Sequence, residues 1–188
     1  MAKKRQSFLQ KVKSFSPSRL VFIDESGFQV RMGRSHAWVK KGQERIERRP
    51  MNWGKNLTAI GAVRLCGWVQ QSTMFASMTK NRFVAWFAKK LVPKLRRGDV
   101  VFLDNLPAHH DDRILSLARR AGARVLYLPP YSPDLNPIEP GWALQKQVVK
   151  RAAPRTPTAL RTVVQRARYR VSPRHIRGWF QFAGYQFR

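Results

Sequence analysis

Hydrophobic and polar positions alternate along this chain in blocks that predict strands and helices. Short apolar runs, bounded by polar or glycine-containing turns, occur at residues 20–23, 57–65, 68–75, 100–103 and 125–128. Runs of this length are typical of buried strands. The segment Arg34–Lys40 has a similar pattern and predicts a further short strand. Ser26-Gly27 has the composition of a turn, but alternation resumes beyond it, which is consistent with a bend or a bulge.

The segment between the last two strands has the spacing of an amphipathic helix. Its apolar residues recur at i, i+3, i+4 and i+7 from Ile114 to Ala121. Asp111 or Asp112 is placed to cap this helix, and Gly122 is placed to end it. The sequence therefore predicts strand, helix and strand in succession, the unit that joins two parallel strands.

Other segments also have helical spacing. Residues 83–91 form one, with Asn81 as the expected cap. Another starts within Asn136–Glu139, and the Thr-Pro and Ser-Pro pairs at 156–157 and 172–173 each place a capping residue before a first-turn proline. Hairpin-like strands thus come first, then alternating strands and helices, then helices alone. This order predicts an α/β fold, a mixed sheet with parallel later strands and flanking helices.

The charge of the chain indicates its class of partner. Thirty-seven Lys and Arg face ten Asp and Glu, which gives a formal net charge of +27 over 188 residues. A field of this strength attracts polyanions, so we expect a nucleic acid partner. The alternative is a solvated cationic surface with no such role. The hydrophobic content of 43% is that of a globular chain with a real core.

Several classes of protein are excluded by composition. The single cysteine, Cys66, rules out an internal disulfide framework and a cysteine-rich zinc site. Apolar runs are too short to span a bilayer, and the N-terminus lacks the apolar segment of a secretory signal. We therefore expect a reducing interior and no membrane association.

Three of the ten acids lie at or just beyond the ends of apolar strands: Asp24, Asp104 and Glu139. In open α/β sheets, ligands bind at the carboxyl ends of the strands. Carboxylates gathered there repel one another and need a compensating cation. Mg²⁺ is the hard ion that suits such a site, and two such ions can activate a nucleophile on a phosphodiester and stabilise its leaving oxygen. The alternative is that these acids only cap loops.

The segments FIDESG, FLDNLPAH and LPPYSPDLNPIEPGWALQK resemble the catalytic-core signature of bacterial insertion-sequence transposases of the mariner-like (Tc/mariner) superfamily. The resemblance runs from about Leu20 to the terminal GWFQFAGY, and PPYSPDLNPIE is its most specific piece. Thirty-four residues separate Asp104 from Glu139, as is familiar from this superfamily. The chain departs from the family in Pro140, directly after Glu139, and in having no segment like the N-terminal helix-turn-helix domain.

The resemblance implies a ribonuclease H-like fold with a five-stranded mixed sheet of order 3-2-1-4-5. Residues 1–19 would be a basic linker or helix, and residues 20–188 the catalytic domain with its C-terminal helices. Our reading finds one strand more than this fold needs, so Arg34–Lys40 would belong to an inserted hairpin.

The resemblance also implies an activity. Asp24, Asp104 and Glu139 would be the DDE triad that binds Mg²⁺, with Mn²⁺ able to substitute, for DNA cleavage at element ends and strand transfer into target DNA. The expected partners are DNA and a second copy on paired ends, with a separate N-terminal DNA-binding polypeptide as a further possibility. The expected location is the bacterial cytoplasm, at the nucleoid.

Neighbouring residues leave alternatives open. Glu25 could replace Asp24, but consecutive strand side chains point to opposite faces, and we favour Asp24. Asp134 sits in a Ser-Pro-Asp turn and is assigned a structural role, as is Asp99, which follows a glycine. Trp38, Trp86, Trp142 and Trp179 are expected in the core rather than as base-stacking platforms.

Four residues are candidates for DNA contact. Lys146 and Lys150 follow Glu139 at i+7 and i+11 on one helix face, where they fit phosphate contacts. Asn105 directly follows Asp104 and could orient a phosphate or stabilise its loop. His109 could contact DNA or a metal-bound water, but a surface loop position is the simpler expectation.

Two rival functions remain at this stage. One is a catalytically inactive, transposase-derived DNA-binding remnant with the same fold and charge. The other is a different ribonuclease H-like nuclease that acts on RNA–DNA hybrids or junctions. The intact triad argues against the first, and the PPYSPDLNPIE segment argues against the second.

Overall fold

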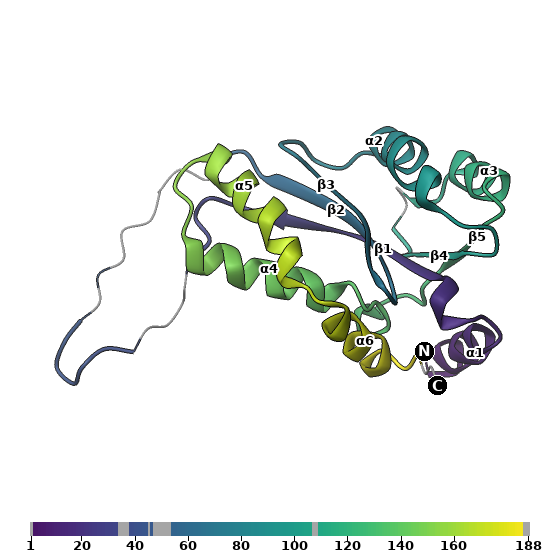
Figure 1. Ribbon diagram of the computed structural model, residues 1–188, viewed down its shortest axis with the longest axis horizontal. Coiled ribbons are helices and arrows are strands. Elements are labelled where there is room, and N and C mark those ends of the chain that lie inside the picture. The colour runs from purple at the N-terminus through teal and green to yellow at the C-terminus, as the bar shows by residue number, and fades with distance from the viewer. Residues whose placement is uncertain (1, 34–37, 45, 47–53, 107–108, 186–188) are drawn as a thin grey trace.

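The sheet has the strand order that the resemblance implies. The computed structural model describes residues 2–33, 38–44, 46, 54–106 and 109–185 (Figure 1). Five strands lie in the order β3-β2-β1-β4-β5, with the bounds β1 Leu20–Phe28, β2 Leu57–Arg64, β3 Gly67–Met74, β4 Val100–Leu103 and β5 Arg124–Tyr127. Strands β1, β2 and β3 pair antiparallel, whereas β4 pairs parallel with both β1 and β5. The mixed five-stranded sheet is confirmed.

Alternation along β1 divides the core into two layers. Leu20 and Phe22 belong to one buried cluster, and Val21 and Ile23 to the other. Consecutive strand residues point to opposite faces, so β1 supplies both layers and is buried on both sides. This explains why its first residues read as a continuous apolar run.

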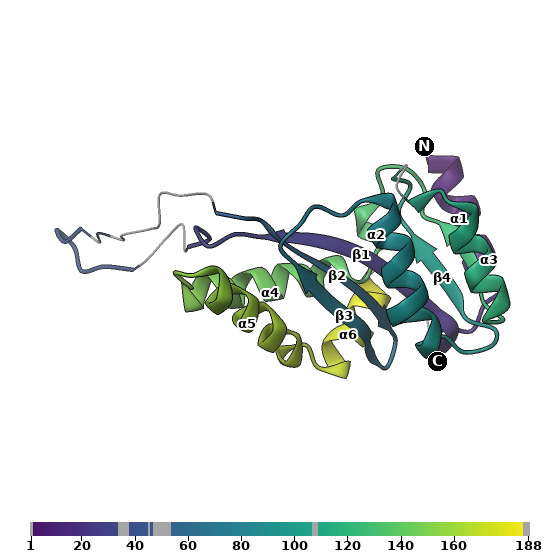
Figure 2. The same ribbon diagram turned by 90° about the horizontal axis from the view of Figure 1, so that it is seen from above.

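Helices cover both faces of the sheet (Figures 1 and 2). The first cluster draws on α1 (Ala2–Lys13), α4 (Glu139–Ala152), α5 (Pro157–Ala167) and α6 (Pro173–Phe182). The second draws on α2 (Lys80–Trp86), its π-helical extension Phe87–Leu91, and α3 (Asp112–Arg120). Helices α4 and α5 lie side by side, and α4 begins at Glu139.

Most of the predicted helix caps are confirmed. Asp111 caps α3 by accepting a hydrogen bond from the Arg113 N–H at 2.9 Å. Thr156 and Ser172 cap α5 and α6, each before a first-turn proline. The cap expected at Asn81 is wrong, because Thr79 accepts from the Arg82 N–H and α2 begins one residue before Asn81.

Three other expectations need correction. Strand β1 has no bulge at Ser26-Gly27, because its ladder with β2 continues through both residues to Phe28 without a register shift. The strand expected at Arg34–Lys40 lies outside the described residues at 34–37, and residues 38–40 form no strand. Trp38 is exposed rather than in the core.

The start of α4 is held against β2 by two tryptophans. A Cβ built on Gly61 would lie 2.6 Å from Trp68 Cζ3 and 3.0 Å from Trp142 Cη2. The two indole rings themselves lie 5.2 Å apart. Only glycine at this position of β2 lets Trp142, on the first turn of α4, approach the sheet so closely. The packing fixes where the residues at the start of α4 stand relative to β1.

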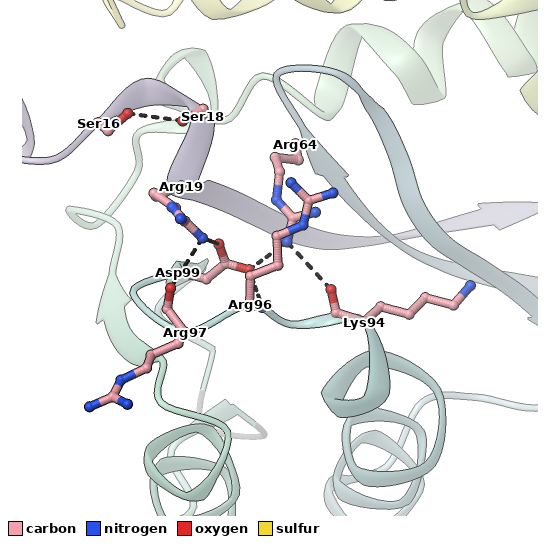
Figure 3. A network of polar contacts seen from close by, with 8 residues as sticks. All are labelled: Ser16, Ser18, Arg19, Arg64, Lys94, Arg96, Arg97 and Asp99. Atoms are coloured by element: carbon pink, nitrogen blue, oxygen red, sulfur yellow. Dashed lines mark hydrogen bonds and ion pairs between the residues drawn. The ribbon is translucent and has the colours of Figure 1, made fainter.

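A buried ion pair closes the opposite end of the parallel strands (Figure 3). Asp99, just before β4, is fully buried and pairs with Arg64 at the end of β2. The same carboxylate accepts a hydrogen bond from the Arg96 N–H at 2.8 Å, and Arg19 donates to the Arg97 carbonyl at 3.1 Å. Asp99 thus has the turn role expected from the sequence and also binds Arg64 of β2, which is distant in sequence.

Helix α1 packs beside the segment that precedes α4. Arg5 pairs with Asp134 and donates to Ser132 Oγ at 3.0 Å. Asp134 therefore has a structural role, but with a partner from the N-terminal helix. Among the described residues, no helix is long and apolar enough to cross a membrane.

Candidate active site

Asp24 and Asp104 stand just past the last paired residues of two parallel strands. The ladder between β1 and β4 pairs Leu20–Phe22 with Val100–Phe102, and each aspartate lies two residues further on. Glu139 is the first residue of α4. All three carboxylates line one open pocket of about 450 Å³, together with Asn105 and the turn Leu128–Pro133. The structure thus gathers the three acids that the sequence singled out.

Asp24 is anchored to α4 by a side-chain hydrogen bond. The Trp142 Nε1–H donates to Asp24 Oδ2 at 3.1 Å. Burial, and then the negative charge of Glu139, raise the pKa of Asp24 from its ordinary value to about 8. Asp104 contributes to the same shift. The surroundings of Asp24 therefore disfavour its ionised form beside Glu139, and a bound cation would offset this repulsion.

Asp104 is held differently, by its own loop. Its Oδ1 accepts a hydrogen bond from the Leu106 N–H at 3.1 Å and faces Nδ1 of His109. Burial raises the pKa of Asp104, but the contact with His109 outweighs this effect and the net direction is downward. Burial also lowers the pKa of His109, and its bonds to Asp104 and Glu25 overcome this and raise that pKa to about 9.

Glu139 is placed by the turn that precedes α4. The Tyr185 hydroxyl donates to the Leu135 carbonyl at 2.6 Å and so fixes the 3-10 turn Pro133–Leu135. Pro140 stands in the first turn, where its missing N–H has no helical partner to lose. Burial raises the pKa of Glu139, and the positive charge of Lys146 acts against that rise.

The donor set suits a hard divalent cation. Carboxylate oxygens from three separate elements face one pocket, and Mg²⁺ takes such ligands while keeping several waters. The raised pKa values of Asp24 and Glu139 show carboxylates crowded together, a state that a cation relieves. Within the part of the chain that is described, no three His, Cys, Asp or Glu residues lie close enough together to coordinate one metal ion in this conformation. Asp24 and Asp104 are instead held by Trp142 and His109.

The four candidates for DNA contact differ in exposure. Lys150 and Asn105 are exposed, and Lys146 is partly buried near Glu139. His109 is 1% exposed, so the expected surface position is wrong. Both of its ring nitrogens face carboxylates of the protein, which leaves neither of them for a phosphate.

Sequence reasoning missed the groups that support the three acids. Trp142 read as a core residue, and it is one, but its indole nitrogen also reaches Asp24. Glu25 was considered only as a substitute for Asp24. It points to the other face, as alternation predicts, and meets His109 at 3.2 Å. Each contact joins residues far apart in sequence, so no local spacing could reveal it.

Comparison with known proteins identifies the family of this chain. Residues 19–161 match the family model described as DDE superfamily endonuclease. No curated protein matches the chain.

The chain is also similar to solved structures. They include the Mos1 transposase paired-end complex with left transposon end, at 17% identity and a TM-score of 0.72, and the Mos1 Strand Transfer Complex, at 18% identity and 0.71. The matches cover 95% and 97% of this chain but only 56% and 57% of those chains. At such identities the likeness concerns the fold, and this chain spans little more than half the length of those proteins.

Proposed function

This chain belongs to the DDE superfamily endonuclease family, and on that premise we propose that it is the catalytic domain of an insertion-sequence transposase. It cuts DNA strands at the ends of the element and joins the freed 3′-hydroxyl to target DNA, in a reaction that depends on divalent metal. The catalytic domain extends over residues 20–188, and residues 2–13 form the helix that docks on it.

One observation carries the proposal. Asp24, Asp104 and Glu139 come from β1, from the loop after β4 and from the start of α4, and they line the same pocket. The chain has only ten acids among 188 residues, and a DNA-binding surface has little use for isolated carboxylates. Three of them in one pocket of a +27 chain indicate a cation site.

The three carboxylates would hold Mg²⁺, or Mn²⁺ in its place. Such a cation, when bound, helps to deprotonate the attacking water or 3′-hydroxyl and to stabilise the leaving oxygen. The residues around it position the ligands: Trp142 holds Asp24, and the Pro133–Leu135 turn sets the start of α4. Lys146 places a positive charge near Glu139, where it suits a DNA phosphate.

The helical layer beside the pocket is suited to bind the DNA backbone. Residues 140–188 contain eleven Lys and Arg and no Asp or Glu. Most of those that the structure describes are exposed, among them Lys150, Arg166, Arg170 and Arg174. Phosphate contacts of this kind position a duplex without reading its bases.

The partners follow from this function. The substrates are the element ends and target DNA, and a homodimer acting on paired ends is the expected assembly. Solved structures of Mos1 transposase include a paired-end complex with a transposon end and a strand transfer complex, which supports DNA as the partner here. A separate N-terminal DNA-binding polypeptide could supply the recognition of element ends. Its place of action is the bacterial nucleoid, where the DNA is.

A joining assay tests the proposal. A short duplex with a free 3′-hydroxyl is incubated with supercoiled plasmid and Mn²⁺, and joined product is measured for the parent and for Asp104→Ala. Joining by the parent alone supports a transposase. Cleavage of RNA–DNA hybrids or junctions without joining would favour the other nuclease, and DNA binding without any cleavage would favour the inactive remnant.

A further inference from the structure

His109 connects the two strand ends that carry the candidate metal ligands. Its Nδ1 faces Asp104 Oδ1, and its Nε2 lies 3.2 Å from Glu25 Oε1. Glu25 is the direct neighbour of Asp24 on β1, but on the opposite face of the sheet. One imidazole thus ties the loop after β4 to the residue beside Asp24.

The bridge stands where backbone pairing between the two strands has ended. The last residues paired between β1 and β4 are Phe22 and Phe102. Beyond them, Asp24 continues in β1 and stays paired with β2, whereas Asp104 follows the end of β4, so no ladder between β1 and β4 sets the separation of the two aspartates. The contact Glu25–His109–Asp104 spans that gap with side chains.

The imidazole itself is fixed from several directions. Its ring centroid lies 4.3 Å from that of Phe83 on α2. The Tyr127 hydroxyl, at the end of β5, donates to the His109 carbonyl at 3.1 Å, and the His109 N–H donates to the Leu106 carbonyl at 2.9 Å. A ring that is 1% exposed and held in this way is a rigid spacer rather than a mobile surface group.

The bridge also selects which oxygen of Asp104 is available. Oδ1 is taken by the Leu106 N–H and by His109. Among the described residues, no protein group donates to Oδ2, and Asp104 lines the pocket. Oδ1 of Asp104 is therefore engaged by the protein, whereas Oδ2 is available to a ligand in the pocket.

We propose that His109 and Glu25 are positioning residues for the metal-binding carboxylates. His109 fixes the rotation of Asp104 and, through Glu25, the distance between Asp104 and Asp24. Neither residue binds the metal itself. The inference rests on the proposed function only in taking Asp24 and Asp104 as ligands, because the bridge itself is a property of the metal-free protein.

The first part of the test needs no metal. Unfolding free energies are measured by urea titration in EDTA for the parent, Glu25→Gln, Asp104→Asn and the double variant, and then for the same set in a His109→Phe background. Phenylalanine keeps a ring against Phe83 but donates no hydrogen bond. A bridge predicts a favourable coupling between Glu25 and Asp104 that is lost or reversed without His109. Equal coupling in both backgrounds would overturn it.

The second part measures Mn²⁺ affinity by calorimetry. His109→Phe is expected to weaken binding by about 10- to 100-fold, as supporting residues around metal ligands do. His109→Asn can still donate to Asp104 and should recover part of that loss. His110→Phe is the comparison variant: a phenylalanine ring there can still stack on Tyr127, and the exposed His110 bonds Asn105 at 2.7 Å rather than Asp104 or Glu25, so its replacement should weaken binding less than His109→Phe does.

The outcomes separate the two proposals. Coupling through His109, together with weaker Mn²⁺ binding that His109→Asn partly restores, supports the positioning role. Coupling with unchanged Mn²⁺ affinity in His109→Phe would overturn that role while leaving the site intact. Parent binding that Asp104→Asn does not weaken would contradict the metal site itself, and the positioning role with it.

Discussion

The indole nitrogen of Trp142 donates a hydrogen bond to Asp24 across 3.1 Å, and so joins helix α4 to strand β1. Trp142 lies three residues after Glu139 on the same helix. The contact therefore links the first and third acids of the candidate site through a buried side chain. Trp142 therefore has two roles: its ring packs α4 against the sheet, and its indole N–H orients the Asp24 carboxylate.

Replacing Trp142 by phenylalanine separates these two roles. Trp142→Phe keeps an aromatic ring in the core but removes the side-chain donor to Asp24. We expect a loss of about 1–3 kcal/mol in unfolding free energy and weaker Mn²⁺ binding. Urea titration and calorimetry measure the two effects.

Trp68→Phe is the matched control for this prediction. Trp68 packs on Trp142, but its buried Nε1 has no hydrogen-bond partner within the described part of the chain. Its replacement changes similar ring area without removing a polar contact. Equal effects of the two substitutions on Mn²⁺ affinity would contradict an orienting role for Trp142.

Asp24→Asn should stabilise the metal-free protein at alkaline pH. The folded pKa of Asp24 is about 8, above its ordinary value of 3.8, so between these values the folded state holds a proton that the unfolded state has lost. The stability of the parent therefore falls as pH rises from about 4 to 8. Asparagine carries no charge and should remove this slope, with a gain on the order of 5 kcal/mol at pH 9.

The measurement is thermal unfolding in EDTA at pH 5 and pH 9 for the parent and Asp24→Asn. Glu44→Gln, which removes an exposed carboxylate, serves as the control. The stability difference between Asp24→Asn and the parent should be larger at pH 9 than at pH 5. An equal difference at both pH values would show that the site does not disfavour the charge of Asp24.

The sequence predicts this fold well because its strongest signals are local. Apolar runs mark β4 and β5, helical spacing marks α3, and Asp-, Thr- and Ser-type caps mark helix starts. The three acids could be proposed as a group because each follows a recognisable strand or starts a helix. Local pattern misled at Ser26-Gly27, where pairing with β2 overrides turn composition.

Contacts between distant segments could not be predicted in the same way. Asp99 read as a turn residue because its glycine neighbour is visible in the sequence, whereas its partner Arg64 is 35 residues away. His109 read as a surface residue because it follows a polar loop. Its burial depends on Phe83 of α2 and on Glu25 of β1, which only the folded chain brings together.

The buried pair of Asp99 and Arg64 should be important for stability. Arg64→Met leaves the fully buried Asp99 carboxylate without its main cation, and such a change costs about 3–5 kcal/mol. The double variant Arg64→Met, Asp99→Leu should lose less than Arg64→Met alone, because it removes both charges. Chemical denaturation of the three proteins tests this, and a double variant less stable than Arg64→Met would contradict it.

The acid-free helical layer should bind duplex DNA through its arginines. A triple substitution to glutamine at Arg166, Arg170 and Arg174 is compared with one of equal charge change at Lys90, Arg119 and Arg120 on the other face, all of them exposed. The first set should reduce the salt dependence of binding by up to about 3 in the slope of log K against log salt. Equal losses for both sets would indicate attraction by net charge alone.

The central claim is that Asp24, Asp104 and Glu139 form a metal-dependent DNA-cleaving site. Nicking of supercoiled plasmid in Mn²⁺ at low ionic strength tests it most directly, since weak phosphate contacts are strongest there. Asp24→Asn, Asp104→Asn and Glu139→Gln are compared with the parent and with Asp112→Asn, which removes one exposed carboxylate outside the pocket. We predict nicking by the parent and by Asp112→Asn, and none above background by the three site variants. Nicking at parental rate by any of the three would contradict the claim.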